Sequence, residues 1–327
     1  MTSMQESDIM RRKYQPNKNF YYTNISSRIF AVLISLMLAA PLVNAAENAQ
    51  QSTYDKAEDA VAALLAALRK DDQDAVLDIF GRQYEEELIG GDDVASRETR
   101  RIVARAMQTH TNLVDDGRNR KILIIGSEEW PLPFPLVREK RRWRFDTGAG
   151  IEEVVNRRVG RNELGAISNC HAAIDAQVEY ASADRDGDEV LEYAQVIIST
   201  EGKKDGLFWE AADGEEASPF GPFIADAKGY LEGRDPGDPF RGYFYKVITR
   251  QGTNAPGGRY DYIINGNMIA GFGLIAFPAD HGNSGVMTFM CNHQGKVYET
   301  DFGPDSDLIA AGIDEYNPDA SWKLVGE

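Results

Sequence analysis

The chain has 327 residues, 43% of them hydrophobic, and a formal net charge of −17 at pH 7. This length suggests about two globular units, and the hydrophobic content is enough for a packed core, which excludes wholesale disorder. The acidity argues against nucleic-acid binding, because a nucleic-acid binder needs a basic face to displace counterions from phosphates. Two cysteines exclude a disulfide-dense scaffold and a zinc site built from four thiolates.

Residues 1–45 have the layout of a secretory signal peptide. Basic side chains open the segment, an apolar run extends from Ile29 to Val43, and the run ends in small residues suited to cleavage after Ala45. The run is shorter than the roughly 20 apolar residues of a transmembrane helix. We therefore expect an exported protein, periplasmic or secreted, with no membrane span after cleavage. An uncleaved N-terminal anchor is the alternative.

Export changes the interpretation of Cys170 and Cys291. In an oxidising compartment two cysteines tend to close into a disulfide, so we predict a bridge between them. Two buried free thiols are the alternative.

Residues 52–147 are predicted to form a first α+β domain, in which helices precede a small antiparallel sheet. Apolar side chains between Ala57 and Leu68 recur with helical spacing, and a second short helix passes through Val76 and Phe80. The later elements are expected to be a helix at about 94–113 and strands at about 121–126, 132–137 and 142–145.

Residues 150–327 are predicted to form a second domain, a long helix packed on an antiparallel β meander. An apolar stripe places the helix at about 151–183, an acidic turn ends it, and a shorter helix is expected from Glu189 to Ser199. A long loop from Glu201 to Arg241 is then either functional or packed by its own aromatic residues. The meander strands are expected at about 243–249, 260–264, 268–277, 286–292 and 296–300, with a hairpin turn at Asn265-Gly266.

Several long motifs resemble the bacterial exported proteins of domain-of-unknown-function family 2950. They include "VEYASADRDGDEVLEYAQVIIST", "GKKDGLFW", "SPFGPFI" and "GYFYKVITRQGTNAPGGRYDYIINGNMIAGFGLIAFPADHGNSGVMTFMCNHQGKVYETDFGPD". The resemblance covers about Ser52 to Trp322. It implies export and brings no established activity to any position of this chain.

Two further resemblances concern parts of the chain. The segments "AVAALLAALRKDDQDAVLDIF" and "RRWRFD" resemble the opening of proteins of the nuclear-transport-factor-2-like type, which implies helices laid on a curved sheet. The second half is similar to the globular scaffold of type IV pilin-like proteins, through Asn162-Glu163 and Ala176–Tyr180 on the long helix. A pilin keeps its apolar N-terminal helix, whereas this chain has a signal-peptidase-type site there.

The acidic turn is a candidate metal site. Calcium takes six to eight oxygen ligands, which clustered carboxylates supply, although the spacing here departs from the EF-hand. The predicted ligands are Asp184, Asp186, Asp188 and Glu192. A turn that ends one helix and caps the next is the alternative. Calcium is the candidate ion, and no organic cofactor is expected.

Tyrosines alternate along the predicted meander strands and form a candidate ligand groove for a sugar or a peptide. They are Tyr243, Tyr245, Tyr260, Tyr262 and Tyr298. Sheet packing is the alternative, because aromatic residues are common in half-buried strands.

No constellation of residues defines a reaction. The leading hypothesis is therefore an exported envelope protein that binds another envelope protein or a small ligand. A hydrolase using the clustered carboxylates is the first alternative, and a soluble pilin-like accessory of a secretion or surface system is the second. Carboxylates with raised pKa values in one cleft would favour the enzyme.

Overall fold

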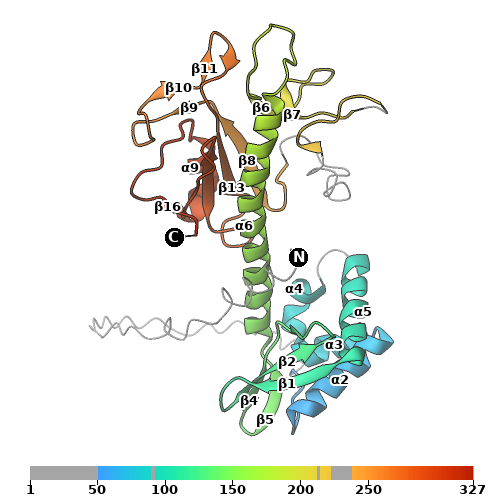
Figure 1. The fold of residues 1–327 in the computed structure, drawn as a ribbon. Coiled ribbons are helices and arrows are strands. Elements are labelled where there is room, and N and C mark those ends of the chain that lie inside the picture. Colours follow the sequence, from blue (N-terminus) through green and yellow to red (C-terminus); the bar gives the residue numbers. More distant parts are fainter. Residues whose placement is uncertain (1–50, 90–92, 212–213, 222–237, 327) are drawn as a thin grey trace, which may run out of the picture. The chain divides into compact units, whose positions relative to one another are not determined.

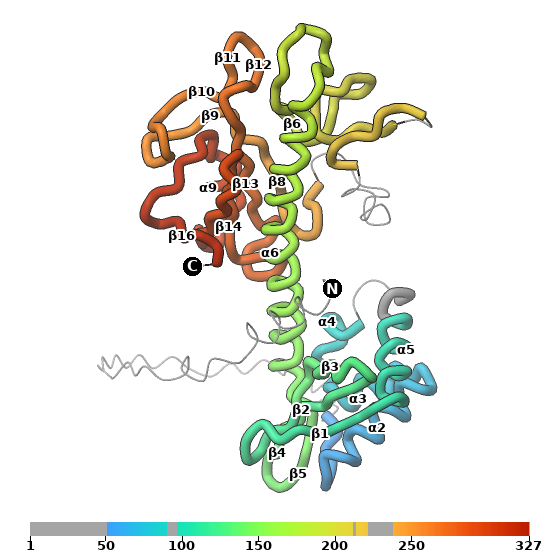
Figure 2. Tube along the Cα trace, viewed as in Figure 1, coloured from blue at the N-terminus to red at the C-terminus, as the bar shows by residue number. Residues whose placement is uncertain are grey.

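The computed structural model describes residues 51–89, 93–211, 214–221 and 238–326, except that no side chains are described for 93–96. Figure 1 labels the helices and strands, and Figure 2 follows the same chain as a tube. The predicted signal peptide lies outside the described residues. The chain divides between Asn48 and Ala49, so all of the described residues belong to one unit.

The first part of the described chain is α+β, as predicted. Its helices are α2 (Ala57–Lys70), α3 (Gln73–Phe80), η1 (Arg82–Tyr84), α4 (Glu85–Ile89) and α5 (Asp93–Thr109). Its strands are β1 (Thr111–Asp115), β2 (Arg120–Ile125), β3 (Trp130–Pro131), β4 (Leu136–Glu139) and β5 (Arg142–Phe145). The antiparallel sheet has the order β1-β2-β4-β5. Strand β3 pairs with Ile124 and Ile125 of β2, on the side away from β1.

The charged residues between α2 and α3 explain the break between these helices. Asp71 ends α2 in the left-handed conformation, with φ of 52°. Asp72 then caps α3, because its carboxylate accepts a hydrogen bond from the Ala75 N–H at 3.0 Å. The two helices and α5 pack on the sheet around buried Leu64, Leu123 and other apolar side chains.

The helix predicted at about 94–113 ends earlier than expected, at Thr109. Residues 111–115 form β1 instead, paired in register with β2. The half-buried Leu113 side chain packs against the core of this part from the strand, so tertiary packing overrides the helical spacing.

Helix α6 (Thr147–Tyr180) is 34 residues long. It starts inside the stretch Thr147–Gly150 that separates the two predicted domains, and the division there stays a prediction. Asp146 caps the helix by accepting from the Ala149 N–H, and the Thr147 hydroxyl donates to the Phe80 carbonyl at 2.5 Å.

The C-terminal sheet has the order β16-β15-β14-β13-β8 and is antiparallel throughout. Its strands are β8 (Tyr243–Ile248), β13 (Gly273–Pro278), β14 (Thr288–Asn292), β15 (Val297–Thr300) and β16 (Lys323–Leu324). Every residue of β13 is buried, because Leu274 and Ala276 face the cluster that contains α6, whereas Ile275 and Phe277 face the cluster that contains Ala310 of α9 (Ser306–Ala311). The long helix and the antiparallel strands of the prediction are therefore confirmed.

Short hairpins extend from this sheet. Strands β9 (Arg250–Gln251) and β10 (Tyr260–Asp261) form one, and β11 (Ile263–Ile264) and β12 (Asn267–Met268) form another. The turn of the second hairpin is Asn265-Gly266, with φ of 55° and 99°, as the sequence predicts. The strand expected at 268–277 is interrupted after Met268 and resumes at Gly273.

The prediction of a helix from Glu189 to Ser199 is wrong. The segment has no helix, and it ends in β6 (Val196–Ile198), which pairs in parallel with β7 (Gly206–Phe208). Its backbone groups have tertiary partners instead of helical ones: the Tyr193 N–H donates to the Met268 carbonyl at 2.8 Å. Strand β7 lies within the predicted loop from Glu201 to Arg241, of which residues 222–237 lie outside the described residues.

Candidate functional site

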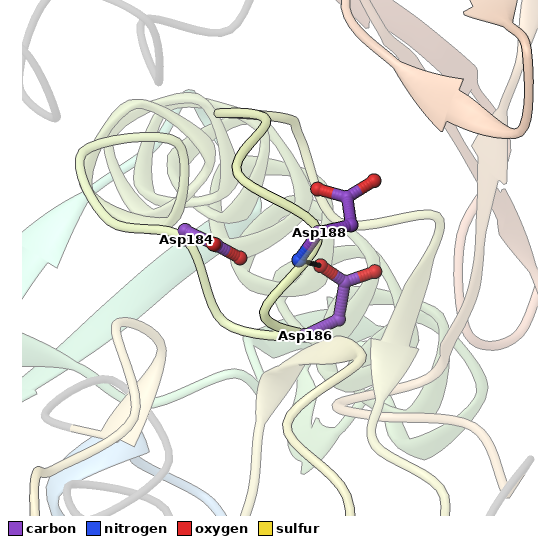
Figure 3. A group of neighbouring side chains, drawn as sticks. All are labelled: Asp184, Asp186 and Asp188. Atoms are coloured by element: carbon purple, nitrogen blue, oxygen red, sulfur yellow. Dashed lines mark hydrogen bonds between the residues drawn. The ribbon is translucent and has the colours of Figure 1, made fainter.

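The loop that follows α6 gathers three of the four predicted metal ligands. Carboxylate oxygens of Asp184, Asp186 and Asp188 all lie within 4.8 Å of one another, and the three side chains are exposed. Figure 3 shows the three carboxylates projecting from this one loop. Glu192, the fourth predicted ligand, is not in the group. Its carboxylate accepts the Met268 N–H at 2.9 Å.

Backbone N–H groups already hold these carboxylates in place. Asp184 accepts from Gly187 at 2.7 Å and from Glu189 at 2.9 Å, and these two bonds lower the pKa of its carboxyl. Asp186 accepts from the N–H of Asp188 at 3.3 Å. The loop therefore folds as a set of Asx-type turns. Its three negative charges offer oxygen ligands to a divalent ion, and the calcium site stays a prediction.

Arg185 lies between two aspartates of the acidic loop, but its side chain contacts residues outside that loop. Its side chain is only 5% exposed, forms an ion pair with Glu216 at 3.1 Å, and lies over the rings of Tyr180 and Trp209 at 4.8 and 5.8 Å. Burial raises the pKa of Tyr180 to about 12. Arg185 therefore anchors the loop to the segment that follows β7, a role that the sequence pattern did not reveal.

The hairpin β11–β12 is joined to the segment after the acidic loop, and Figure 2 shows the two side by side. The Asn267 amide donates to the Asp188 carboxylate at 2.6 Å, and the Gln195 amide donates to the Gly266 carbonyl at 2.7 Å. The two joined segments carry exposed apolar side chains: Leu191 is 56% exposed, Ile264 46% and Ile269 43%. We call these three residues with Asp184, Asp186 and Asp188 the acid–apolar surface.

The two cysteines come together, as a disulfide would require. Cys170 lies on α6 and Cys291 on β14, both are fully buried in the same apolar cluster, and the structure has them as free thiols. Burial and the adjoining Cys170 thiol raise the pKa of the Cys291 thiol. The disulfide itself stays a prediction.

The five tyrosines of the predicted ligand groove do not share one surface. Tyr243 and Tyr245 face α6, where the Tyr243 hydroxyl donates to the Met287 carbonyl and the Asn169 amide donates to the Tyr245 hydroxyl. Tyr298 packs in the cluster on the opposite face of the sheet. Tyr262 is fully buried in a third cluster, and Tyr260 packs edge-on against it. The alternation along the strands is therefore used for packing on both faces.

The pKa shifts of five described carboxyl groups have one direction. Where the pKa of an Asp or Glu in this part of the chain departs clearly from its ordinary value, the direction is downward. The affected groups are Glu139, Asp184, Asp205, Asp301 and Asp319. A hydrolase using clustered carboxylates would need one of them raised, so that it holds a proton near neutral pH.

None of the helices in the described residues combines the length and the hydropathy needed to cross a bilayer.

Comparison with known proteins gives one match. The model of a family described as "Protein of unknown function (DUF2950)" covers residues 51–325. Nothing among the curated proteins and nothing among the solved structures matches the chain. The resemblance to pilin-like scaffolds finds no support in these comparisons, and the likeness to nuclear-transport-factor-2-like proteins is not confirmed by them.

Proposed function

The chain belongs to the DUF2950 family, whose description assigns no activity, and we propose that it is an exported envelope protein that binds a partner through the acid–apolar surface. Export is supported by the basic opening, the apolar run Ile29–Val43 and the small residues before the expected cleavage after Ala45. Periplasmic or secreted localisation follows from the same segment.

The observation that carries the binding proposal is the exposure of Leu191, Ile264 and Ile269 on two segments that the Asn267–Asp188 hydrogen bond joins at the cluster of three carboxylates. Single exposed apolar residues are ordinary, but a group of them on hydrogen-bonded neighbouring segments marks an interaction site. The tertiary hydrogen bonds hold the group in one arrangement before binding, which lowers the entropy cost of association. The expected partner presents apolar side chains flanked by Lys or Arg, because the surface joins apolar and negative groups.

Site-specific photocrosslinking in the envelope of the native host tests this proposal. A photoreactive amino acid at position 191 or 264 is expected to give the same discrete adduct. The matched control is Leu308 on α9, which is apolar and 74% exposed but lies outside the surface. Replacing Asp184, Asp186 and Asp188 together by Asn should reduce the adduct. Equal adducts from positions 191 and 308, or no adduct from 191 and 264, would contradict the proposal.

We also propose that Cys170 and Cys291 are joined in the exported protein. Closing the bond removes two protons and two electrons from the two thiols. A reactive disulfide of an envelope thiol-oxidising enzyme accepts them and becomes a dithiol. The support is that the two thiols adjoin in the core between α6 and β14.

A further inference from the structure

Strand β1 lies at one end of the first sheet. Its inner side pairs with β2, and no strand of the described residues pairs with its outer side. Natural proteins usually protect such an edge with Lys, Pro or a bulge. The sequence of β1, Thr-Asn-Leu-Val-Asp, contains neither Lys nor Pro, and its register with β2 runs without a bulge from 111 to 115.

The hydrogen bonds that flank β1 reveal which of its residues bond to β2. The Asp116 N–H donates to the Arg120 carbonyl, and the Gly126 N–H donates to the His110 carbonyl, both at 3.0 Å. His110 and Asp116, the residues that flank β1, are even-numbered, and each bonds to a residue at one end of β2. Bonded and non-bonded pairs alternate along an antiparallel ladder, so the even-numbered residues of β1 are the ones that bond to β2.

The odd-numbered residues consequently direct their backbone groups outward. Leu113 lies opposite Leu123, and the Leu123 carbonyl already accepts the Leu132 N–H at 2.7 Å on the side away from β1. This agrees with a non-bonded pair at Leu113 and Leu123. The outward N–H and C=O groups therefore belong to Thr111, Leu113 and Asp115.

A cavity of about 490 Å³ opens beside these outward groups, between β1 and α2. Val61 and Leu65 of α2 line it together with Leu113 and the fully buried Leu123, so it reaches the hydrophobic core. Thr111 also lines it. In a strand added to β1, successive side chains would point to opposite faces of the sheet. Those on the face of Leu113 would enter this apolar space.

Glu58 gives the cavity a negative rim. It lies in the first turn of α2, lines the cavity, and forms no ion pair with any other described residue. Asp59 is its neighbour, and no Lys or Arg lines the cavity. The charge therefore favours an occupant that carries Lys or Arg next to its apolar residues.

We infer that the outer edge of β1 binds an extended peptide segment of a partner protein, which adds to the sheet as a further strand. Its apolar side chains occupy the cavity at alternate positions, and a Lys or Arg meets Glu58. Residues of this site lie in the first part of the chain, apart in sequence from those of the acid–apolar surface. Binding at the edge depends on neither that surface nor export.

Selection from a random nonapeptide library on the purified full chain tests this inference. Enriched peptides are expected to have apolar residues at alternate positions and a Lys or Arg near one end. A synthetic peptide of the enriched sequence should slow amide hydrogen exchange at Thr111, Leu113 and Asp115. The amides of Asn112 and Val114 already bond to β2 and should change little. Failure to enrich such peptides, or protection that spares the three odd-numbered amides, overturns the inference.

Matched variants sharpen the test. Thr111→Pro removes one outward N–H at an exposed first residue of the strand, where Pro is tolerated, and should weaken the peptide about tenfold. Glu58→Gln should weaken it about two- to fivefold, whereas Asp59→Asn, which does not line the cavity, should leave it unchanged. Protection of the same amides that rises with protein concentration in low-salt buffer without peptide, where charge repulsion keeps copies apart, would assign the edge to a second copy and overturn the inference.

Discussion

Gln177 of α6 holds the backbone of Ala194 at both of its polar groups. Its amide nitrogen donates to the Ala194 carbonyl and its amide oxygen accepts the Ala194 N–H, each at 2.8 Å, and both residues are buried. This pair fixes the segment that carries Leu191 against the helix. A side chain therefore substitutes for the helical hydrogen bonds that this segment lacks.

Gln177→Ala should lower the free energy of unfolding by about 2–4 kcal/mol, because two buried backbone groups lose their partner. Denaturant unfolding followed by circular dichroism measures the change. Gln294→Ala is the control: Gln294 is exposed, and the change should stay within about 0.5 kcal/mol. Equal stability of the two variants would contradict the role given to Gln177.

The first turn of α6 contains two glycines with opposite expected responses. A Cβ on Gly150 would lie 2.0 Å from Cδ1 of Phe134, so Gly150→Ala should destabilise the protein by about 1–3 kcal/mol through overpacking. A Cβ on Gly148 would meet only the Tyr84 hydroxyl at 3.5 Å. Gly148→Ala should therefore stabilise by up to about 1 kcal/mol through helix propensity. Thermal unfolding of both variants measures the difference, and a stabilised Gly150→Ala protein would refute the packing argument.

Protein isolated from the envelope under non-reducing conditions should contain no reactive thiols after denaturation. Reduction should release those of Cys170 and Cys291, as thiol labelling with mass analysis would show. Reduction should also cost about 4–5 kcal/mol of stability in the chain-entropy account of a loop of this length. Two labelled cysteines before reduction would exclude the bridge. The Cys170→Ser variant is the labelling control, since only Cys291 then reacts.

The acidic loop should lose its turns in acid. Backbone N–H groups lower the pKa of Asp184 in the folded protein, so its contribution to stability is present above the pKa of the unfolded chain, about 3.9. That contribution is lost as the pH falls through the lower, folded value. A carboxyl-detected NMR titration should give Asp184 a lower pKa in the folded protein than in a synthetic peptide of residues 181–191. A value equal to or above that of the peptide would contradict the hydrogen bonds.

The regular parts of the fold were predictable because they depend on local signals. The helix α6 and the Asn265-Gly266 turn require little beyond their own neighbours, and the structure has both. The segment after Glu189 was mispredicted because its apolar spacing suits a helix. The bonds of Gln177 and Met268 to it come from residues that sequence spacing does not connect.

The candidate sites follow the same division. The three aspartates lie two residues apart in sequence, so their clustering was predictable, whereas the hydrogen bond from Asn267 of the hairpin to Asp188 was not. Tyrosine alternation marked β8 and β15 correctly, whereas Tyr262 lies between β10 and β11. The alternation did not say which face is buried, because both faces of the C-terminal sheet are covered. Predicting the free edge of β1 would have required the strand order and register of the whole sheet, which sequence spacing does not give.

The open edge of β1 also has a colloidal consequence. Identical chains that expose such an edge tend to stack through it, and the formal net charge of −17 should hold the copies apart in dilute buffer. Added salt shortens the range of this repulsion to about 10 Å at 0.1 M and about 3 Å at 1 M. The protein should therefore associate through β1 as ionic strength rises, which increases light scattering. A peptide bound at the edge of β1 should reduce this association.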